Sequence, residues 1–96
     1  MTSTQPTHPK ELYQAMLTMR NPEELSRFCK DLLSKHEIME VSRRWQVAQM
    51  LHDKVPYTEI ETKTGLSSAT IASISHWLKK GLGGYKLAIK RLKDKR

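Results

Sequence analysis

The stretch PYTEIETKTGLSSATIASISHWLKK, residues 56–80, decides the fold of this 96-residue chain. Pro56 opens a first short helical segment, and Gly65 ends it because a positive φ costs glycine little. Ser67 is the expected N-cap of a second segment. Two helices joined by a turn of three to four residues make a helix-turn-helix. The spacing fits this motif, although a plain packing hairpin remains the alternative.

The second segment separates into distinct faces when its residues are spaced at 100°. Ile71, Ile74 and Leu78 form the predicted core face, which Ile60 and Leu66 would join. Ala69, Ser73, His76 and Lys80 point the opposite way; Ser68, Ala72, Ser75 and Lys79 lie along one flank, and Thr70 and Trp77 along the other. Small outward residues let a helix enter a DNA groove closely, but none provides the bidentate arginine–guanine contact. We therefore expect DNA docking with weak direct readout per residue.

The rest of the chain also shows helical periodicity, and no alternating strand pattern is visible. A first helix is predicted from Pro9, and a second starts with Asn21 as N-cap, Pro22 at the first position and Glu24 reaching back as in a capping box. A third is predicted from about His36 to His52, and the last follows the GLGG break at residues 81–84. The fold class is therefore all-α, with about six helices.

Each of these helices carries an apolar stripe. The predicted inward residues are Leu12, Met16 and Met19; Leu25, Phe28, Cys29, Leu32 and Leu33; Ile38, Val41, Trp45, Ala48 and Leu51; and Tyr85, Ala88, Ile89 and Leu92. Arg43 and Arg44 lie off the stripe of the third helix. They are candidates for a small anion or a phosphate, with a salt bridge to Glu40 or to a neighbouring helix as the alternative.

Positive charge is concentrated in the C-terminal part of the chain. The net charge is +7; residues 56–96 carry nine Lys/Arg against three Asp/Glu, whereas residues 1–55 carry eight against seven. Lys79 and Lys80 end the second segment, and Lys86, Lys90, Arg91, Lys93, Lys95 and Arg96 follow. This pattern favours a polyanionic partner, and these side chains suit phosphate contacts. A solubilising basic tail is the alternative.

Composition excludes several classes of protein. Mean hydropathy is −0.63, and the short apolar runs predict no membrane span. The first ten residues lack the apolar core of a signal peptide, so we expect a cytoplasmic protein that joins the nucleoid when bound to DNA. A core of this size is marginal, which makes a partner subunit a reasonable expectation.

Neither a metal site nor an enzyme is expected. Cys29 is a single cysteine on an apolar stripe, typical of a buried, inert thiol. His8, His36, His52 and His76 are scattered without partner ligands. The sequence has no Gly-rich phosphate loop, no supported nucleophile–histidine arrangement and no facing carboxylates.

The segments LSKHEIMEVSRRWQVAQML and YTEIETKTGLSSATIASISHWLKKGLGGY resemble the Trp-repressor superfamily, and within it the Trp-repressor-like YerC/YecD family. The resemblance covers roughly residues 10–93 and is most specific at SRRWQVAQML, TGLSSATI and GLGGY. It implies an intertwined, all-helical homodimer whose helix-turn-helix units protrude. Residues 9–54 would then be dimerisation helices, residues 56–80 the helix-turn-helix and residues 84–96 a basic C-terminal helix, after a disordered start at residues 1–8.

The resemblance also implies where a corepressor would bind. Tryptophan-binding members hold it with two arginines, of which the first matches Arg43 and the second falls at Ser73. A carboxylate ligand would lack a bidentate partner at Ser73, so we expect no tryptophan binding in the family's manner. Trp77 could close a pocket there, with core or dimer packing as the alternative; any corepressor is unidentified, and no other cofactor is expected.

The sequence therefore predicts a homodimeric transcriptional regulator, with repression as its expected mode, that binds a palindromic operator in double-stranded DNA. The expected DNA contacts are Tyr57, Thr58, Ser67, Ser68, Ala69, Thr70, Ala72, Ser73, His76, Lys79 and Lys80. The alternative is a protein- or RNA-interaction module that uses the helical hairpin and the basic C-terminal helix.

Overall fold

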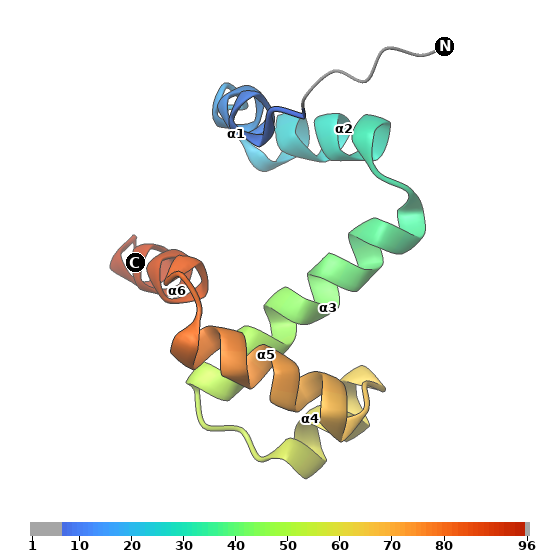
Figure 1. Ribbon diagram of the computed structural model, residues 1–96, viewed down its shortest axis with the longest axis vertical. Coiled ribbons are helices and arrows are strands. Elements are labelled where there is room, and N and C mark those ends of the chain that lie inside the picture. The colour runs from blue at the N-terminus through green and yellow to red at the C-terminus, as the bar shows by residue number, and fades with distance from the viewer. Residues whose placement is uncertain (1–6, 96) are drawn as a thin grey trace. The chain divides into compact units, whose positions relative to one another are not determined.

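The computed structural model describes residues 7–95, in which six α-helices and no strands are present. The helices are α1 (Pro9–Leu17), α2 (Pro22–Leu32), α3 (Lys35–His52), α4 (Tyr57–Thr64), α5 (Ser68–Lys80) and α6 (Gly84–Asp94) (Figure 1). The all-α prediction is confirmed, and each predicted helix is found. Residues 1–6 of the predicted disordered start lie outside the described residues.

The chain divides into two compact units, Met1–Ile38 and Met39–Arg96. In the first unit, Asn21 caps α2 by accepting the Glu24 N–H at 2.9 Å, as the sequence predicted. The Glu24 carboxylate, however, accepts the N–H of Arg20 at 2.8 Å, one residue earlier than a capping box requires. Neither α1 nor α2 contains a buried residue, and Cys29 is half-buried. The predicted stripes are therefore only partly covered within this unit.

A reciprocal capping box that the sequence reading missed stands at the start of α3. The Ser34 hydroxyl accepts the Glu37 N–H at 3.1 Å, and the Glu37 carboxylate accepts the Ser34 N–H at 2.8 Å. The backbone hydrogen bond to Ser34, followed by the one to its side chain, lowers the pKa of Glu37 below its ordinary value. The two reciprocal bonds satisfy the Ser34 and Glu37 N–H groups, which would otherwise lack partners at the start of the helix.

The other end of α3 is closed by a Schellman turn. Lys54 has a left-handed backbone, with φ of 66°, and donates its N–H to the Leu51 carbonyl at 3.1 Å. Val55 donates to the Met50 carbonyl at 3.0 Å. Pro56 follows directly, and α4 begins at the next residue. This turn redirects the chain from α3 into α4 (Figure 1).

The second unit contains the core. Val47, Ala48, Ile60, Ile71 and Ile74 form one buried cluster that joins α3, α4 and α5. Leu78 and Ile89 are also buried, and Trp45 and Tyr85 are half-buried against the cluster, with their rings stacked at a centroid distance of 6.4 Å. The structure thus confirms Ile71, Ile74 and Leu78 as the core face of α5.

Two predicted stripes differ from the structure. Val41 was predicted to face inward but is 54% exposed, whereas the unpredicted Val47 is fully buried, because the cluster covers the C-terminal half of α3. In α6, Ile89 is buried as predicted, but Ala88 and Leu92 are exposed. Periodicity identifies an apolar face, but it does not show how far along a helix the packing partners extend.

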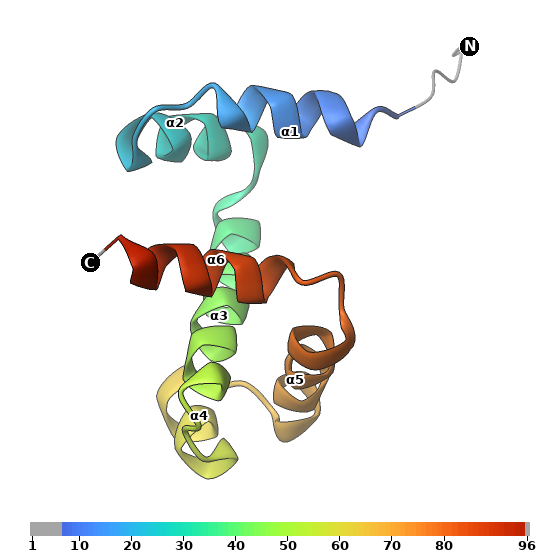
Figure 2. The ribbon, with the colours of Figure 1, turned by 90° about the vertical axis from the view of Figure 1, so that its left-hand side faces the viewer.

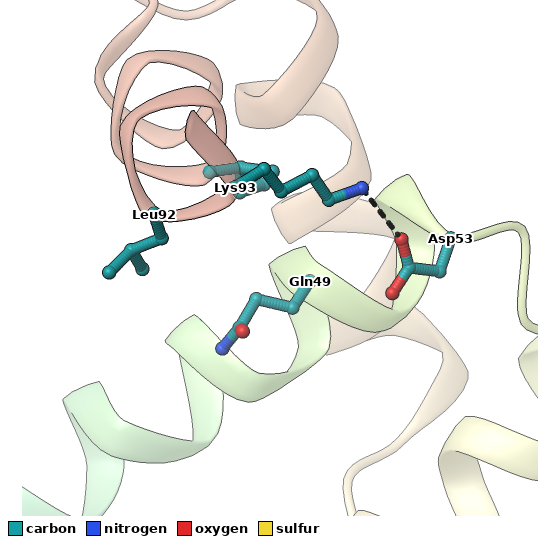
Figure 3. Close-up of a pocket in the computed structure, with 5 residues that line it drawn as sticks. Gln49, Asp53, Leu92 and Lys93 are labelled. Atoms are coloured by element: carbon teal, nitrogen blue, oxygen red, sulfur yellow. Dashed lines mark hydrogen bonds and ion pairs between the residues drawn. The ribbon is translucent and has the colours of Figure 1, made fainter. Parts of the chain in front are cut away.

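The second unit also has an ion pair between distant parts of the chain. Lys93 Nζ on α6 lies 3.5 Å from a carboxylate oxygen of Asp53, which follows α3 (Figure 3). The two charged side chains line a pocket together with Gln49, Ile89 and Leu92. Both charged side chains are more than half exposed, so solvent weakens their attraction, and the buried Ile89 contributes more to the position of α6.

Candidate nucleic-acid interface

The α4–α5 hairpin is built from local backbone signals and a shared apolar contact. Gly65 ends α4 in the left-handed conformation with φ of 73°, as predicted. Ser67 caps α5 by accepting the Thr70 N–H at 3.2 Å. The buried side chains Ile60 and Ile71, with half-buried Leu66, belong to the core or pack against it. These contacts hold α5 against α3 and α4, and the course of the α4 and α5 ribbons can be followed in Figure 2.

α5 presents its small residues to solvent. Ser68, Ala69, Ala72, Ser73 and His76 are all exposed, as are Lys79 and Lys80 in the last turn. An exposed face of serine and alanine in the first two turns of a helix leaves the backbone accessible to a groove. The charge needed to hold a polyanion comes at the far end of the same helix.

Three side chains of α5 have surroundings that the 100° spacing of its residues did not predict. Ser75, placed on a flank, is buried at 7% exposure. Thr70 is half-buried, and its hydroxyl lies 3.1 Å from the Ser67 hydroxyl. Trp77 is 56% exposed and meets His76 edge to face, with ring centroids 5.2 Å apart. Trp77 is therefore not a core residue of this chain.

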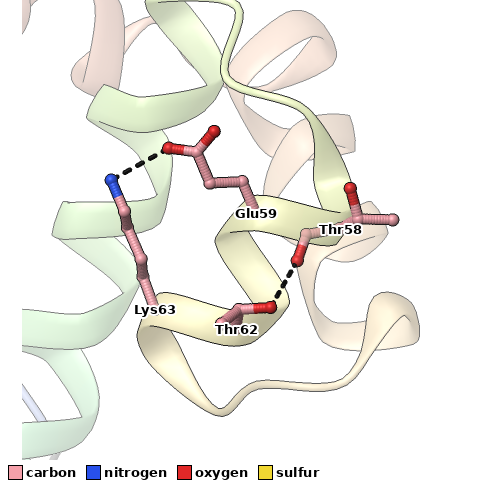
Figure 4. A network of polar contacts seen from close by, with 4 residues as sticks. All are labelled: Thr58, Glu59, Thr62 and Lys63. Carbon is pink, nitrogen blue, oxygen red and sulfur yellow. Dashed lines mark hydrogen bonds and ion pairs between the residues drawn. The ribbon is translucent and has the colours of Figure 1, made fainter.

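α4 contributes a polar outer surface beside α5. Tyr57 and Thr58, both predicted DNA contacts, are exposed in its first turn. Thr62 donates its hydroxyl to the Thr58 carbonyl at 3.0 Å, and Lys63 forms a 2.9 Å ion pair with Glu59 (Figure 4). The Glu59 carboxylate is thus held by a lysine one turn later along the same helix.

The basic side chains after α5 are exposed on α6 and at its C-cap. Lys86, Lys90, Arg91 and Lys95 are exposed, and Arg96 lies outside the described residues. Lys93 is engaged with Asp53. These cations follow the hairpin in sequence and belong to the same unit. Their positive charge suits contacts to phosphate, which position a protein on nucleic acid without reading its sequence.

Of the three predicted ligand residues, Arg43 lines a cavity beside α5. A cavity of about 140 Å³ is lined by Glu40, Arg43, Arg44, Leu66 and Thr70. Arg43 thus lies at a concave site beside α5, and Arg44 joins it. Neither Ser73 nor Trp77 lines this cavity. Two of the three predicted ligand residues therefore lie elsewhere on α5.

Among residues 7–95, no three His, Cys, Asp or Glu side chains gather closely enough to hold a metal ion. No helix in the described part of the chain has the length and apolar character needed to cross a membrane.

Comparison with known proteins identifies the family. The family model described as Trp repressor protein matches residues 7–93. The chain is 37% identical over 84 residues to the uncharacterized protein YerC of Bacillus subtilis (strain 168), covering 88% of this chain and 81% of that protein.

Solved structures agree with this match. A TrpR-like protein from Eubacterium eligens superimposes with a TM-score of 0.84 and 36% identity, covering 88% of this chain and 87% of that one. A candidate Trp repressor from Staphylococcus aureus gives 0.83 and 36%, covering 88% and 85%. The chain belongs to the Trp repressor family, a family of DNA-binding regulators.

Proposed function

We propose that the protein is a sequence-specific transcriptional regulator, acting as a repressor, whose α4–α5 hairpin docks in the major groove of DNA. One observation carries the proposal. The inner face of α5 packs into the core through buried isoleucines, while its N-terminal half exposes Ser68, Ala69, Ala72 and Ser73. A rigid helix with short outward side chains fits a groove closely, and serine hydroxyls and alanine methyls contact base edges.

Lysines supply the affinity that this face lacks. Lys79 and Lys80 are exposed in the last turn of α5, and the cations of α6 follow. Each lysine that neutralises a phosphate releases a counterion, so affinity for duplex falls steeply with salt. Tyr57 and Thr58 would meet the backbone from the first turn of α4.

The active form is proposed to be a homodimer. Leu17 is 84% exposed and Leu32 is 51% exposed, and α1 and α2 contain no buried residue. Apolar side chains left open on two helices, in a chain whose core is small, support a second copy as their cover. A two-fold dimer would read a palindrome with half-sites about one helical turn apart.

Control by tryptophan is not part of the proposal. Arg43 lines a cavity, but the family's second arginine is replaced by the exposed Ser73, which does not line it. A corepressor carboxylate would lose a charge-assisted bidentate partner. Isothermal calorimetry with tryptophan should therefore detect no micromolar binding, and a micromolar Kd would contradict this part of the proposal.

Selection from random duplexes tests the function itself. The expected result is one enriched palindromic motif, and repeating the selection with a pool of amino acids and related metabolites identifies any effector. If no motif is enriched, the regulator proposal fails. Retention of RNA or of an acidic protein in that case would favour an interaction module instead.

A further inference from the structure

A further pocket opens in the second unit beside the turn that joins α3 to α4, with α5 as its other side. Its volume is about 240 Å³. Leu51, Val55 and Leu78 give it apolar walls, and Ser75, which is 7% exposed, adds a hydroxyl. Apolar walls with a few polar groups are the usual form of a small-molecule site.

The charged side chains of this pocket are both cationic. Lys54 enters from the Schellman turn and Lys79 from the last turn of α5, and no carboxylate is among the described residues that line it. Tyr57 contributes a further hydroxyl and an aromatic ring. Lys54 holds a left-handed backbone fixed by the hydrogen bonds at the end of α3, so its side chain leaves from a defined position. Apolar walls flanked by two cations suit an organic anion better than a bare phosphate.

We propose that this pocket binds a small organic carboxylate with an aromatic or branched apolar body, and that this ligand weakens DNA binding. The effect of the ligand on DNA binding, which is the regulatory half of this proposal, rests on the proposed function. Lys79 and Tyr57 line the pocket and are also proposed DNA contacts. A carboxylate seated between Lys54 and Lys79 neutralises charge that would otherwise hold phosphate. By linkage, duplex DNA must lower the affinity for the carboxylate by the same factor.

The site is separate from the cavity at Arg43. The lining of that cavity comes from α3, from Leu66 in the turn and from Thr70 on α5, and it shares no residue with this pocket. The two sites can therefore be tested independently by substitution.

Amide chemical shifts of the full chain, titrated without DNA, test the pocket. The probe is 3-phenylpropionate. Two controls accompany it: 3-phenylpropanol has the same phenylpropyl group but no charge, and inorganic phosphate is an anion without an apolar group. The expected result is saturable shifts at Lys54, Ser75 and Leu78 with 3-phenylpropionate, with a Kd of about 1 mM or below. Equal shifts with the alcohol or with phosphate would overturn the proposal, as would no saturation with the carboxylate.

Two substitutions locate the binding. Lys54→Asn removes the charge with a residue that tolerates the left-handed conformation, and Lys79→Gln removes the other. Each substitution should raise the Kd for 3-phenylpropionate about tenfold, the loss expected for one charge-assisted hydrogen bond. Lys35→Gln removes one charge at the start of α3, outside the pocket, and should leave the Kd unchanged. If all three variants bind alike, the carboxylate is not held by this pocket.

A competition experiment tests the regulatory half. Saturating 3-phenylpropionate should lower the affinity for a selected duplex at least about threefold, and Lys54→Asn should abolish this effect. Unchanged duplex affinity despite saturation overturns the regulatory half. Failure of the protein to bind any duplex would instead sink the proposed function, and the DNA-free titration would still decide whether the pocket binds the carboxylate.

Discussion

Lys54 is the one non-glycine residue with a positive φ among the described residues, at 66°. A side chain in the left-handed region costs roughly 1–2 kcal/mol relative to glycine, which adopts it freely. We expect Lys54→Gly to raise the free energy of unfolding by about 0.5–1 kcal/mol, after subtracting the greater entropy of glycine in the unfolded chain. Urea denaturation measures this change.

Lys54→Ala is the matched control because it removes the same charge and keeps a Cβ. Its free energy of unfolding should stay close to that of the wild type. Equal stabilisation by glycine and alanine would attribute the gain to charge and would contradict the backbone explanation.

At the scale of the element, the capping box of α3 makes the stability of that helix depend on pH. The folded-state pKa of Glu37 is lowered, chiefly by the backbone hydrogen bond from Ser34. A lowered pKa gives stability that is fully present above the ordinary pKa and is lost as pH falls through the folded value. The Tm difference between the wild type and Glu37→Gln should therefore shrink as the pH falls from about 7 to about 3.

Ser34→Ala separates the two causes of this lowered pKa. It removes the hydroxyl but keeps the backbone N–H that Glu37 accepts, so most of the pH dependence attributed to Glu37 should persist. A Tm difference between the wild type and Glu37→Gln that does not change with pH would contradict the capping account.

The ends of the elements were largely predictable because their signals are local. Asn21, Gly65 and Ser67 each act through a backbone group within four residues, and all three play the predicted role. Ser34 and Glu37 carry the same kind of signal and were overlooked. The turn at Lys54 was harder to predict, because lysine has no preference for a positive φ and only the neighbouring Val55 and Pro56 indicate a stop.

Burial was predictable only where the partner of a stripe lies in the same chain. The face of α5 was correct at Ile71, Ile74 and Leu78, since α3 and α4 lie against it. Val41 and Leu92 lie on equally regular stripes and remain exposed. The sequence also could not show that Arg43 lines a cavity from which Ser73 is absent. The lining of that cavity depends on how α3 packs against α5.

For the whole molecule, the proposed homodimer predicts that folding and association are coupled. If the exposed apolar residues of α1, α2 and α6 are covered only by a second copy, dissociated chains are unstable. Raising the protein concentration tenfold should then raise the Tm by about 3–6 °C. A Tm independent of concentration, together with a monomer mass by sedimentation, would contradict the dimer.

The exposed face of α5 and the lysines at its end are proposed to bind a specific duplex. Its most direct measurement is the affinity for a selected palindrome and for a scrambled duplex as salt is raised, by fluorescence anisotropy. Log affinity should fall linearly with log salt, and the palindrome should bind at least about a thousandfold more tightly. Replacing Lys79 and Lys80 with glutamine, four charges per dimer, should flatten the slope by about 3–4 if each contacts a phosphate. Equal binding of both duplexes, or a slope that the double variant leaves unchanged, would contradict the account.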